Sequence, residues 1–155
     1  MIKIRKATKK DIIPASDLVI KTFVKFNSKE GTKRGVQEYM NHHDPKKNLD
    51  QIKQQFPKYK IFLVAEDRKK IIGIIRGSES RIGNLFVAGK YHKKGIAQKL
   101  IKRFEKIAKK RGSNKIKVRS SLYASGFYLK NGYKKTTGIR KMHGLKLQPM
   151  TKRLK

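Results

Sequence analysis

The chain has 155 residues, and its 42 lysines and arginines against 10 aspartates and glutamates give a formal net charge of +32 at neutral pH. A field of this sign attracts polyanions such as nucleic acid and phosphorylated small molecules. The absence of cysteine excludes disulfides, thiolate nucleophiles and cysteine-ligated zinc, and fits a reducing, cytoplasmic compartment. No stretch approaches the ~20 apolar residues of a membrane span, so we expect no signal peptide and no membrane partner.

The length is that of one ordinary domain, and we expect a single domain over residues 1–155. Near the N-terminus, Ile2 and Ile4 alternate with lysines as in a short strand. Thr8 and Asp11 then have the spacing of a helix capping box. The helix that follows is predicted to bury one apolar face, made of Ile12, Ala15, Leu18, Val19, Phe23 and Phe26.

The next region is predicted to be helical and divided. Residues 28–34 are polar and contain a glycine, which indicates a loop. Helical spacing over residues 36–40 is followed by Asp44 and Pro45, which suit the cap and the first turn of a further segment. Pro57 ends this region.

Strands and the strongest helix of the chain come next. Residues 61–77 hold two apolar runs joined by a polar turn at residues 66–69, which predicts an antiparallel hairpin, and residues 81–89 supply another strand. A helix then begins near Gly95 and ends at Gly112. Its apolar face is Ile96, Ala97, Leu100, Ile101, Phe104, Ile107 and Ala108.

The C-terminal third is predicted to contain a strand, a short helix and a further strand. Residues 115–120 predict a strand, residues 121–131 a short helix stopped by Gly132, and residues 144–154 a further alternating strand. The whole order, β-α-α-β-β-β-α-β-α-β-β, predicts an α/β (α+β) protein with a mixed sheet and helices on its faces.

Lysines gather at a helix start, where acidic side chains are normally favoured. A strand ending at Val87, a loop with Gly89 and a helix opening at Gly95 form a unit whose exposed N–H groups can hold phosphate oxygens. Lys93 and Lys94 add charge there, which favours a bound anion. The alternative is chance clustering, because more than one residue in four is lysine or arginine.

Two motifs resemble signatures of the GCN5-related N-acetyltransferase (GNAT) superfamily. Residues 92–97, HKKGIA, are similar to its Gln/Arg-x-x-Gly-x-Gly/Ala motif after a strand, and residues 120–135, SSLYASGFYLKNGYKK, resemble its second signature. The resemblance is best over residues 61–154 and poor over residues 27–58, where members usually build the acceptor site. It implies the acyl-CoA N-acyltransferase fold, a mostly antiparallel sheet of six to seven strands flanked by about four helices.

The resemblance implies acetyl-coenzyme A (acetyl-CoA) as co-substrate and no metal. Its pyrophosphate would bind the N–H groups of His92, Lys93, Lys94, Gly95, Ile96 and Ala97, and its pantetheine arm the backbone of Leu85, Phe86 and Val87. The Val87 N–H would also polarise the thioester carbonyl as an oxyanion donor. Ser121 and Tyr123 match positions on the pantetheine or adenosine side, and Lys130 either reaches the 3′-phosphate or stays solvated.

Tyr128 matches the tyrosine that similar proteins use as the proton donor. Acyl transfer to an amine expels a thiolate whose conjugate acid has a pKa of about 8.5, judged by cysteine, and a tyrosine with a pKa near 10 can supply its proton. The alternative for Tyr128 is an ordinary half-buried aromatic side chain on a short helix.

The general base does not follow from the resemblance. Many members carry a glutamate on the strand before the phosphate loop, but here Asn84 occupies about that position with Arg81 nearby, and neither can accept a proton. His92 also replaces the commoner glutamine or arginine of the motif. The candidates that remain open are Glu79, Glu38, His42 and His43. A metal site at His42, His43 and Asp44 is not expected, because adjacent side chains do not converge.

The expected function is therefore N-acetylation of a primary amine by direct transfer from acetyl-CoA in a ternary complex, by a monomer or a homodimer. The acceptor stays open among small molecules, peptides and proteins. The alternative is a basic protein on the same fold that associates with nucleic acid or the ribosome and has weak or no transferase activity. The net charge favours this alternative, whereas the even spread of the basic residues does not.

Overall fold

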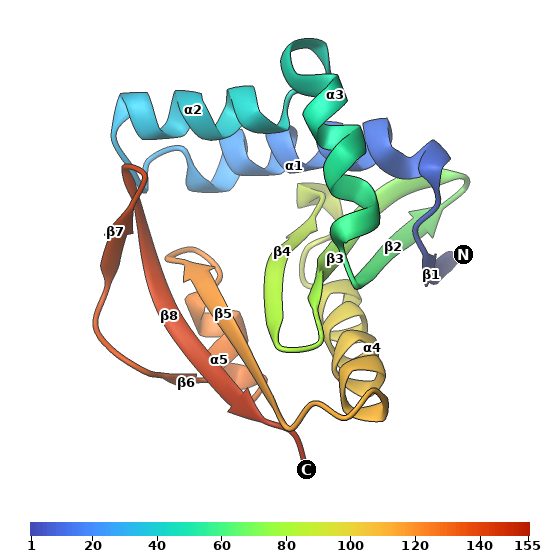
Figure 1. The fold of residues 1–155 in the computed structure, drawn as a ribbon, viewed down its shortest axis with the longest axis vertical. Helices are drawn as coiled ribbons and strands as arrows, with labels where there is room; N and C mark the ends of the chain where they lie inside the picture. The colour runs from blue at the N-terminus through green and yellow to red at the C-terminus, as the bar shows by residue number, and fades with distance from the viewer.

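The computed structural model describes residues 1–155, and its strands form one mixed sheet (Figure 1). The strands are β1 (Ile2–Lys6), β2 (Ile61–Asp67), β3 (Lys70–Ser78), β4 (Arg81–Val87), β5 (Lys115–Ser121), β6 (Lys134–Lys135), β7 (Arg140–Met142) and β8 (Leu145–Arg153). The helices are α1 (Ile12–Asn27), α2 (Lys33–His43), α3 (Pro45–Gln55), α4 (Ile96–Lys110) and α5 (Ser125–Lys130). None of these helices has the length and apolar composition needed to cross a lipid bilayer.

The predicted fold class is confirmed. The strands lie in the order β1-β2-β3-β4-β5-β8-β6, with β7 paired to β8, and only the β4–β5 pair is parallel. The sheet has eight strands rather than six to seven, because residues 134–142 contain two short strands that both pair with β8. There are five α-helices rather than about four, because the divided region forms two separate helices, α2 and α3.

Local capping signals place the N-terminal helices where the sequence predicted them. The Thr8 N–H donates to the Asp11 carboxylate at 2.8 Å, and a short 3-10 turn leads into α1. The Asp44 side chain accepts from the Lys46 N–H at 2.9 Å at the start of α3. The loop expected over residues 28–34 is shorter than predicted, because the Thr32 hydroxyl caps α2 by accepting from the Gly35 N–H at 2.9 Å.

The β2–β3 hairpin is confirmed, but its turn is tighter than the predicted residues 66–69. Only Arg68 and Lys69 lie outside the strands, with φ angles of 51° and 67°. Two consecutive residues with positive φ angles form the two-residue turn that matches the twist of a hairpin. Glu66 thus belongs to β2, where it accepts a hydrogen bond from Arg5 at 2.9 Å.

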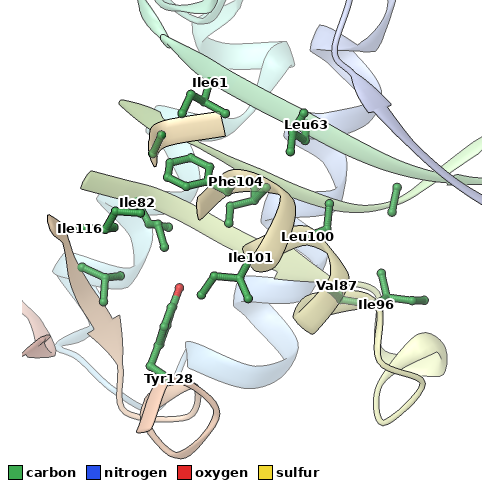
Figure 2. Packing of buried hydrophobic residues seen from close by; sticks show 14 of the residues in the cluster. Ile61, Leu63, Ile82, Val87, Ile96, Leu100, Ile101, Phe104, Ile116 and Tyr128 are labelled. Carbon is green, nitrogen blue, oxygen red and sulfur yellow. The ribbon is translucent and has the colours of Figure 1, made fainter. Parts of the chain in front are cut away.

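The hydrophobic core lies on both faces of the sheet. On one face, α4 packs Leu100, Ile101 and Phe104 against the strands, together with Tyr128 of α5 (Figure 2). On the other face, α1 contributes a smaller cluster with β2 and β3. Gly112, with a φ of 96°, ends α4 as predicted, and the Ser113 N–H returns to the Ala108 carbonyl at 3.0 Å.

Strands β4 and β5 separate soon after they begin. Their only paired residues are Arg81 with Lys117 and Ile82 with Val118, which are the first two residues of β4 and the middle of β5. Figure 1 shows the two strands diverging from there towards their C-terminal ends. The sheet therefore opens at its centre, between β4 and β5. Helices α1 and α2 lie on one side of this opening, and α4 and α5 lie on the other.

Candidate active site

A pocket of about 590 Å³ occupies the opening between β4 and β5. Residues 83–86 of β4 form one wall, and residues 118–121 of β5 form the facing wall. Side chains of α1, α2 and the β7–β8 hairpin close one side of the pocket, which we call its α2 side, and Tyr128 borders the pocket from α5. The splayed strands thus create a cavity that passes through the plane of the sheet.

The residues predicted for the site are distributed around this pocket. Leu85, Phe86, Ser121 and Tyr128 line it. Tyr123 lies outside the lining, with its ring stacked on Phe26 at a centroid distance of 4.8 Å. Lys130 is exposed on α5, outside the pocket and without a hydrogen-bond partner.

The free edge of β4 faces the pocket. The Ala88 N–H donates to the Ile72 carbonyl of β3 at 2.8 Å. Because successive backbone groups of a strand point to opposite edges, the N–H and C=O of Val87 point away from β3, towards the side that β5 has left. The Val87 carbonyl accepts from the His92 Nε2–H at 2.6 Å, whereas its N–H stays open.

The loop before α4 presents a run of unpaired backbone N–H groups. The first helical hydrogen bond joins the Lys99 N–H to the Gly95 carbonyl at 3.0 Å, and no N–H from residue 93 to residue 98 donates to a protein acceptor. The His92 N–H, by contrast, donates to the Gly89 carbonyl at 3.1 Å. The open run is therefore residues 93–98, one position beyond the expected residues 92–97.

Two residues of this loop adopt left-handed backbone conformations that shape it. Gly95, the N-cap of α4, has a φ of 78°, and Lys93 has a φ of 62°. The change of hand at these positions turns successive N–H groups towards one concave surface, which suits an anion. Lys93 and Lys94 are both exposed beside it.

Tyr128 is buried, with 3% of its surface exposed, and its hydroxyl makes no hydrogen bond within the protein. Figure 2 shows its ring extending from α5 towards Ile101 and the β4 side. Burial raises the pKa of the Tyr128 hydroxyl well above the ordinary value of a tyrosine. The side chain therefore remains protonated at neutral pH, as a proton donor must.

Three of the four candidate bases line the pocket on its α2 side: Glu38, His42 and His43. Glu79 lies elsewhere, in the β3–β4 turn, where it pairs with Arg111 at 3.5 Å. Glu38 pairs with Arg34 at 2.9 Å along α2. No three His, Asp or Glu side chains gather closely enough to hold a metal ion.

His43 has a defined tautomer. Its Nδ1 lies 2.9 Å from the Tyr39 carbonyl, which can only accept, so Nδ1 carries the proton and Nε2 keeps its lone pair. Burial is the main cause that lowers the pKa of His43 to about 4, so the ring is neutral at neutral pH.

We expect this burial to make stability depend on pH. In the unfolded chain the pKa of His43 returns to about 6.5, so between pH 6.5 and 4 the unfolded state binds the proton and the folded state does not. The free energy of unfolding should therefore fall by up to about 3 kcal/mol as the pH drops through this window. Urea unfolding from pH 7.5 to 4.5 measures it, and a His43→Asn variant with the same pH slope as the wild type would refute the assignment.

Sequence reasoning missed Glu30, which organises the far wall of the pocket. Its carboxylate accepts from the backbone N–H groups of Leu122 and Tyr123, both at 2.9 Å. This contact fixes the turn that positions Ser121 and α5. No local signal marked Glu30, because its partners lie more than ninety residues away in the sequence.

Asn84 takes part in a polar chain that the sequence did not reveal. Its amide oxygen accepts from the Arg76 Nε–H at 2.8 Å, and its amide nitrogen donates to the Tyr39 hydroxyl at 3.3 Å. Asn84 thus orients the side chains of Arg76 and Tyr39.

Residues 27–154 match the family model for the acetyltransferase (GNAT) domain, and the chain belongs to this family. A search of curated protein sequences found no match. A GCN5-related N-acetyltransferase from Rhodopseudomonas palustris shares the fold, with a TM-score of 0.81 at 18% identity over 98% of this chain and 95% of that one. The PaiA N-acetyltransferase from Thermoplasma acidophilum, solved in complex with coenzyme A, has a TM-score of 0.77 and a sequence identity of 21% over 99% of both chains.

Proposed function

We propose that residues 1–155 form one N-acetyltransferase domain that moves an acetyl group from acetyl-CoA directly to a primary amine in a ternary complex. Family membership supports acetyl transfer, and the coenzyme A complex of the structurally similar PaiA protein supports the donor. The observation that carries the proposal is the run of unpaired N–H groups at residues 93–98, which follows the C-terminal end of β4, the strand whose residues 83–86 line the pocket that Tyr128 also borders.

Binding of the donor follows from these features. The N–H groups of residues 93–98 would hold the pyrophosphate, with Lys93 and Lys94 adding charge. The outward backbone groups of Leu85 and Val87 would pair with the pantetheine arm, in the place that β5 leaves vacant. Because His92 occupies the Val87 carbonyl, the arm would either displace this side chain or use the Leu85 carbonyl.

The transfer needs one bond formed, one bond broken and two proton movements. The neutral amine attacks the thioester carbonyl carbon, and the C–N bond forms while the Val87 N–H stabilises the oxyanion. The C–S bond then breaks, and Tyr128 gives its proton to the departing thiolate. The proton lost by the amine leaves towards the α2 side, where Glu38, His42 and His43 line the pocket.

A thiol-release assay with acetyl-CoA and a panel of primary amines tests this function. We expect free coenzyme A to appear in step with an equal amount of N-acetylated amine. When both substrates are varied, double-reciprocal plots of the initial rates should give intersecting lines. Parallel lines would indicate a covalent acetyl-enzyme and contradict direct transfer. Thiol release that no amine accelerates, across amino acids, peptides and small amines, would contradict the transferase function itself.

A further inference from the structure

Arg76 of β3 is a buried cation without a counter-ion. It is 5% exposed, and no carboxylate lies within ion-pair distance of it. Its Nε–H donates to Asn84 at 2.8 Å, but its two terminal NH₂ groups donate to no protein acceptor. A buried ion is costly to leave unpaired, and burial is what lowers the pKa of Arg76 from its ordinary value.

Aromatic rings compensate this charge only in part. The guanidinium carbon lies 4.7 Å from the centroid of the Tyr59 ring and 5.3 Å from that of Phe62. Such contacts contribute attraction to the faces of the guanidinium, yet they offer no acceptor to the N–H groups at its edge. The edge therefore keeps its capacity for a hydrogen-bonded anion.

A second, smaller pocket of about 70 Å³ opens onto Arg76. Residues of α1, of α3 and of the turn before β2 line it, and none of them is acidic. Besides Arg76, its polar side chains are three amides, two hydroxyl groups and two imidazoles, from Ser16, His42, His43, Asn48, Gln51, Gln55 and Tyr59. This space is large enough for water molecules or for one carboxylate group.

The two pockets are neighbours. His42 and His43 line both of them, so the small pocket lies on the other side of these histidines from the main pocket. Asn84 also connects the two regions, because it lines the main pocket and accepts from Arg76. An acceptor with its amine in the main pocket would therefore have to carry its second group past the histidine pair to reach Arg76.

We propose that this small pocket is an anion subsite in which the Arg76 guanidinium binds a carboxylate of the acceptor substrate. The proposal rests on the proposed acetyl transfer and narrows the acceptor to amines that carry a carboxylate, such as amino acids or short peptides. A planar carboxylate matches the two unoccupied NH₂ groups of a guanidinium edge. A strongly basic chain also attracts an anionic acceptor more readily than a polyamine.

Anion binding can be measured without any turnover. In ¹³C,¹⁵N-labelled apo protein, acetate replaces chloride at constant ionic strength while the arginine side-chain signals are followed by NMR, and inorganic phosphate is used in a parallel titration. We expect the Arg76 signal to shift saturably with acetate and less with phosphate, and the Arg119 signal of the main pocket to change only gradually. An Arg76 signal that changes no more than the exposed arginines would overturn the subsite. Equal saturation by both anions would identify a general anion site and overturn the carboxylate assignment.

The role of the small pocket in binding the acceptor is tested by introducing a carboxylate side chain of the protein itself into this pocket. Gln55→Glu places a negative charge at the small pocket, and Gln54→Glu places the same charge on the same helix outside it. We expect Gln55→Glu to raise the melting temperature and to raise KM for carboxylated amines by about 10- to 100-fold, while Gln54→Glu does neither. The panel should contain each carboxylated amine beside its decarboxylated analogue.

The outcomes separate the two proposals. If carboxylated and decarboxylated amines are acetylated equally well, or if both glutamate variants behave alike, the subsite is wrong and the transferase function stands. If no amine is acetylated but acetate saturates the Arg76 signal, the site binds an anion, and both the transferase function and the acceptor role of the subsite are wrong.

Discussion

We expect the Tyr128→Phe variant to lose about 100-fold or more in turnover, while its dissociation constant for acetyl-CoA stays within about twofold of the wild type. The substitution removes one oxygen atom from a buried ring and leaves the packing of α5 intact. Without a proton donor, the thiolate must leave as an anion. Binding of the donor depends on the backbone of residues 93–98 instead, so it should survive.

The neighbouring tyrosine provides the control. Tyr133 is equally buried, lies 5.3 Å from Tyr128 between ring centroids and donates its hydroxyl hydrogen bond to Glu105 at 2.8 Å. Tyr133→Phe should therefore lower the melting temperature through the lost hydrogen bond and leave turnover nearly unchanged. Comparable turnover in Tyr128→Phe and the wild type would remove Tyr128 from the mechanism.

The second large effect is expected at Gly95. A valine there must adopt a φ near 78°, at a cost of about 1–2 kcal/mol for a residue with a Cβ atom, and the loop can avoid this strain only by changing shape. We expect Gly95→Val to weaken acetyl-CoA binding by about 10-fold in calorimetric titrations. A Cβ atom added at this position meets no other atom within 4 Å, so a collision within the protein is not the cause.

Gly112 is a matched control at the other end of the same helix. Its φ is 96°, and a Cβ added there also meets no atom within 4 Å. Gly112→Val should thus destabilise the fold to a similar extent without changing the affinity for acetyl-CoA. If both valine variants bind acetyl-CoA with the same affinity, the shape of the loop before α4 does not determine donor binding.

Features that depend on nearby residues were predictable from the sequence. The capping box at Thr8 and Asp11, the Asp44–Pro45 helix start and the Gly112 stop each involve residues within one or two turns of each other, and all are present. The sequence also predicted the strand–loop–helix unit around Gly95. Its open run of N–H groups differs by one position because Gly89 begins a short 3-10 turn that uses the His92 N–H.

Features that depend on distant contacts were not predictable in this way. Glu30 joins the turn after β5, and Arg76 meets Asn84 across the β3–β4 pair, so neither residue has a local signal. The separation of β4 and β5 also has no marker in either strand. It becomes visible only when their pairing is seen to stop after two residue pairs.

Donor binding as proposed depends on the backbone N–H groups of residues 93–98, which hold the pyrophosphate of acetyl-CoA. The most direct measurement is an amide NMR titration of ¹⁵N-labelled protein with coenzyme A, repeated with pantetheine, which lacks the pyrophosphate. We expect large, saturable shifts at residues 93–98 with coenzyme A and none there with pantetheine. Saturable coenzyme A binding that leaves these six amides unshifted would contradict this proposal.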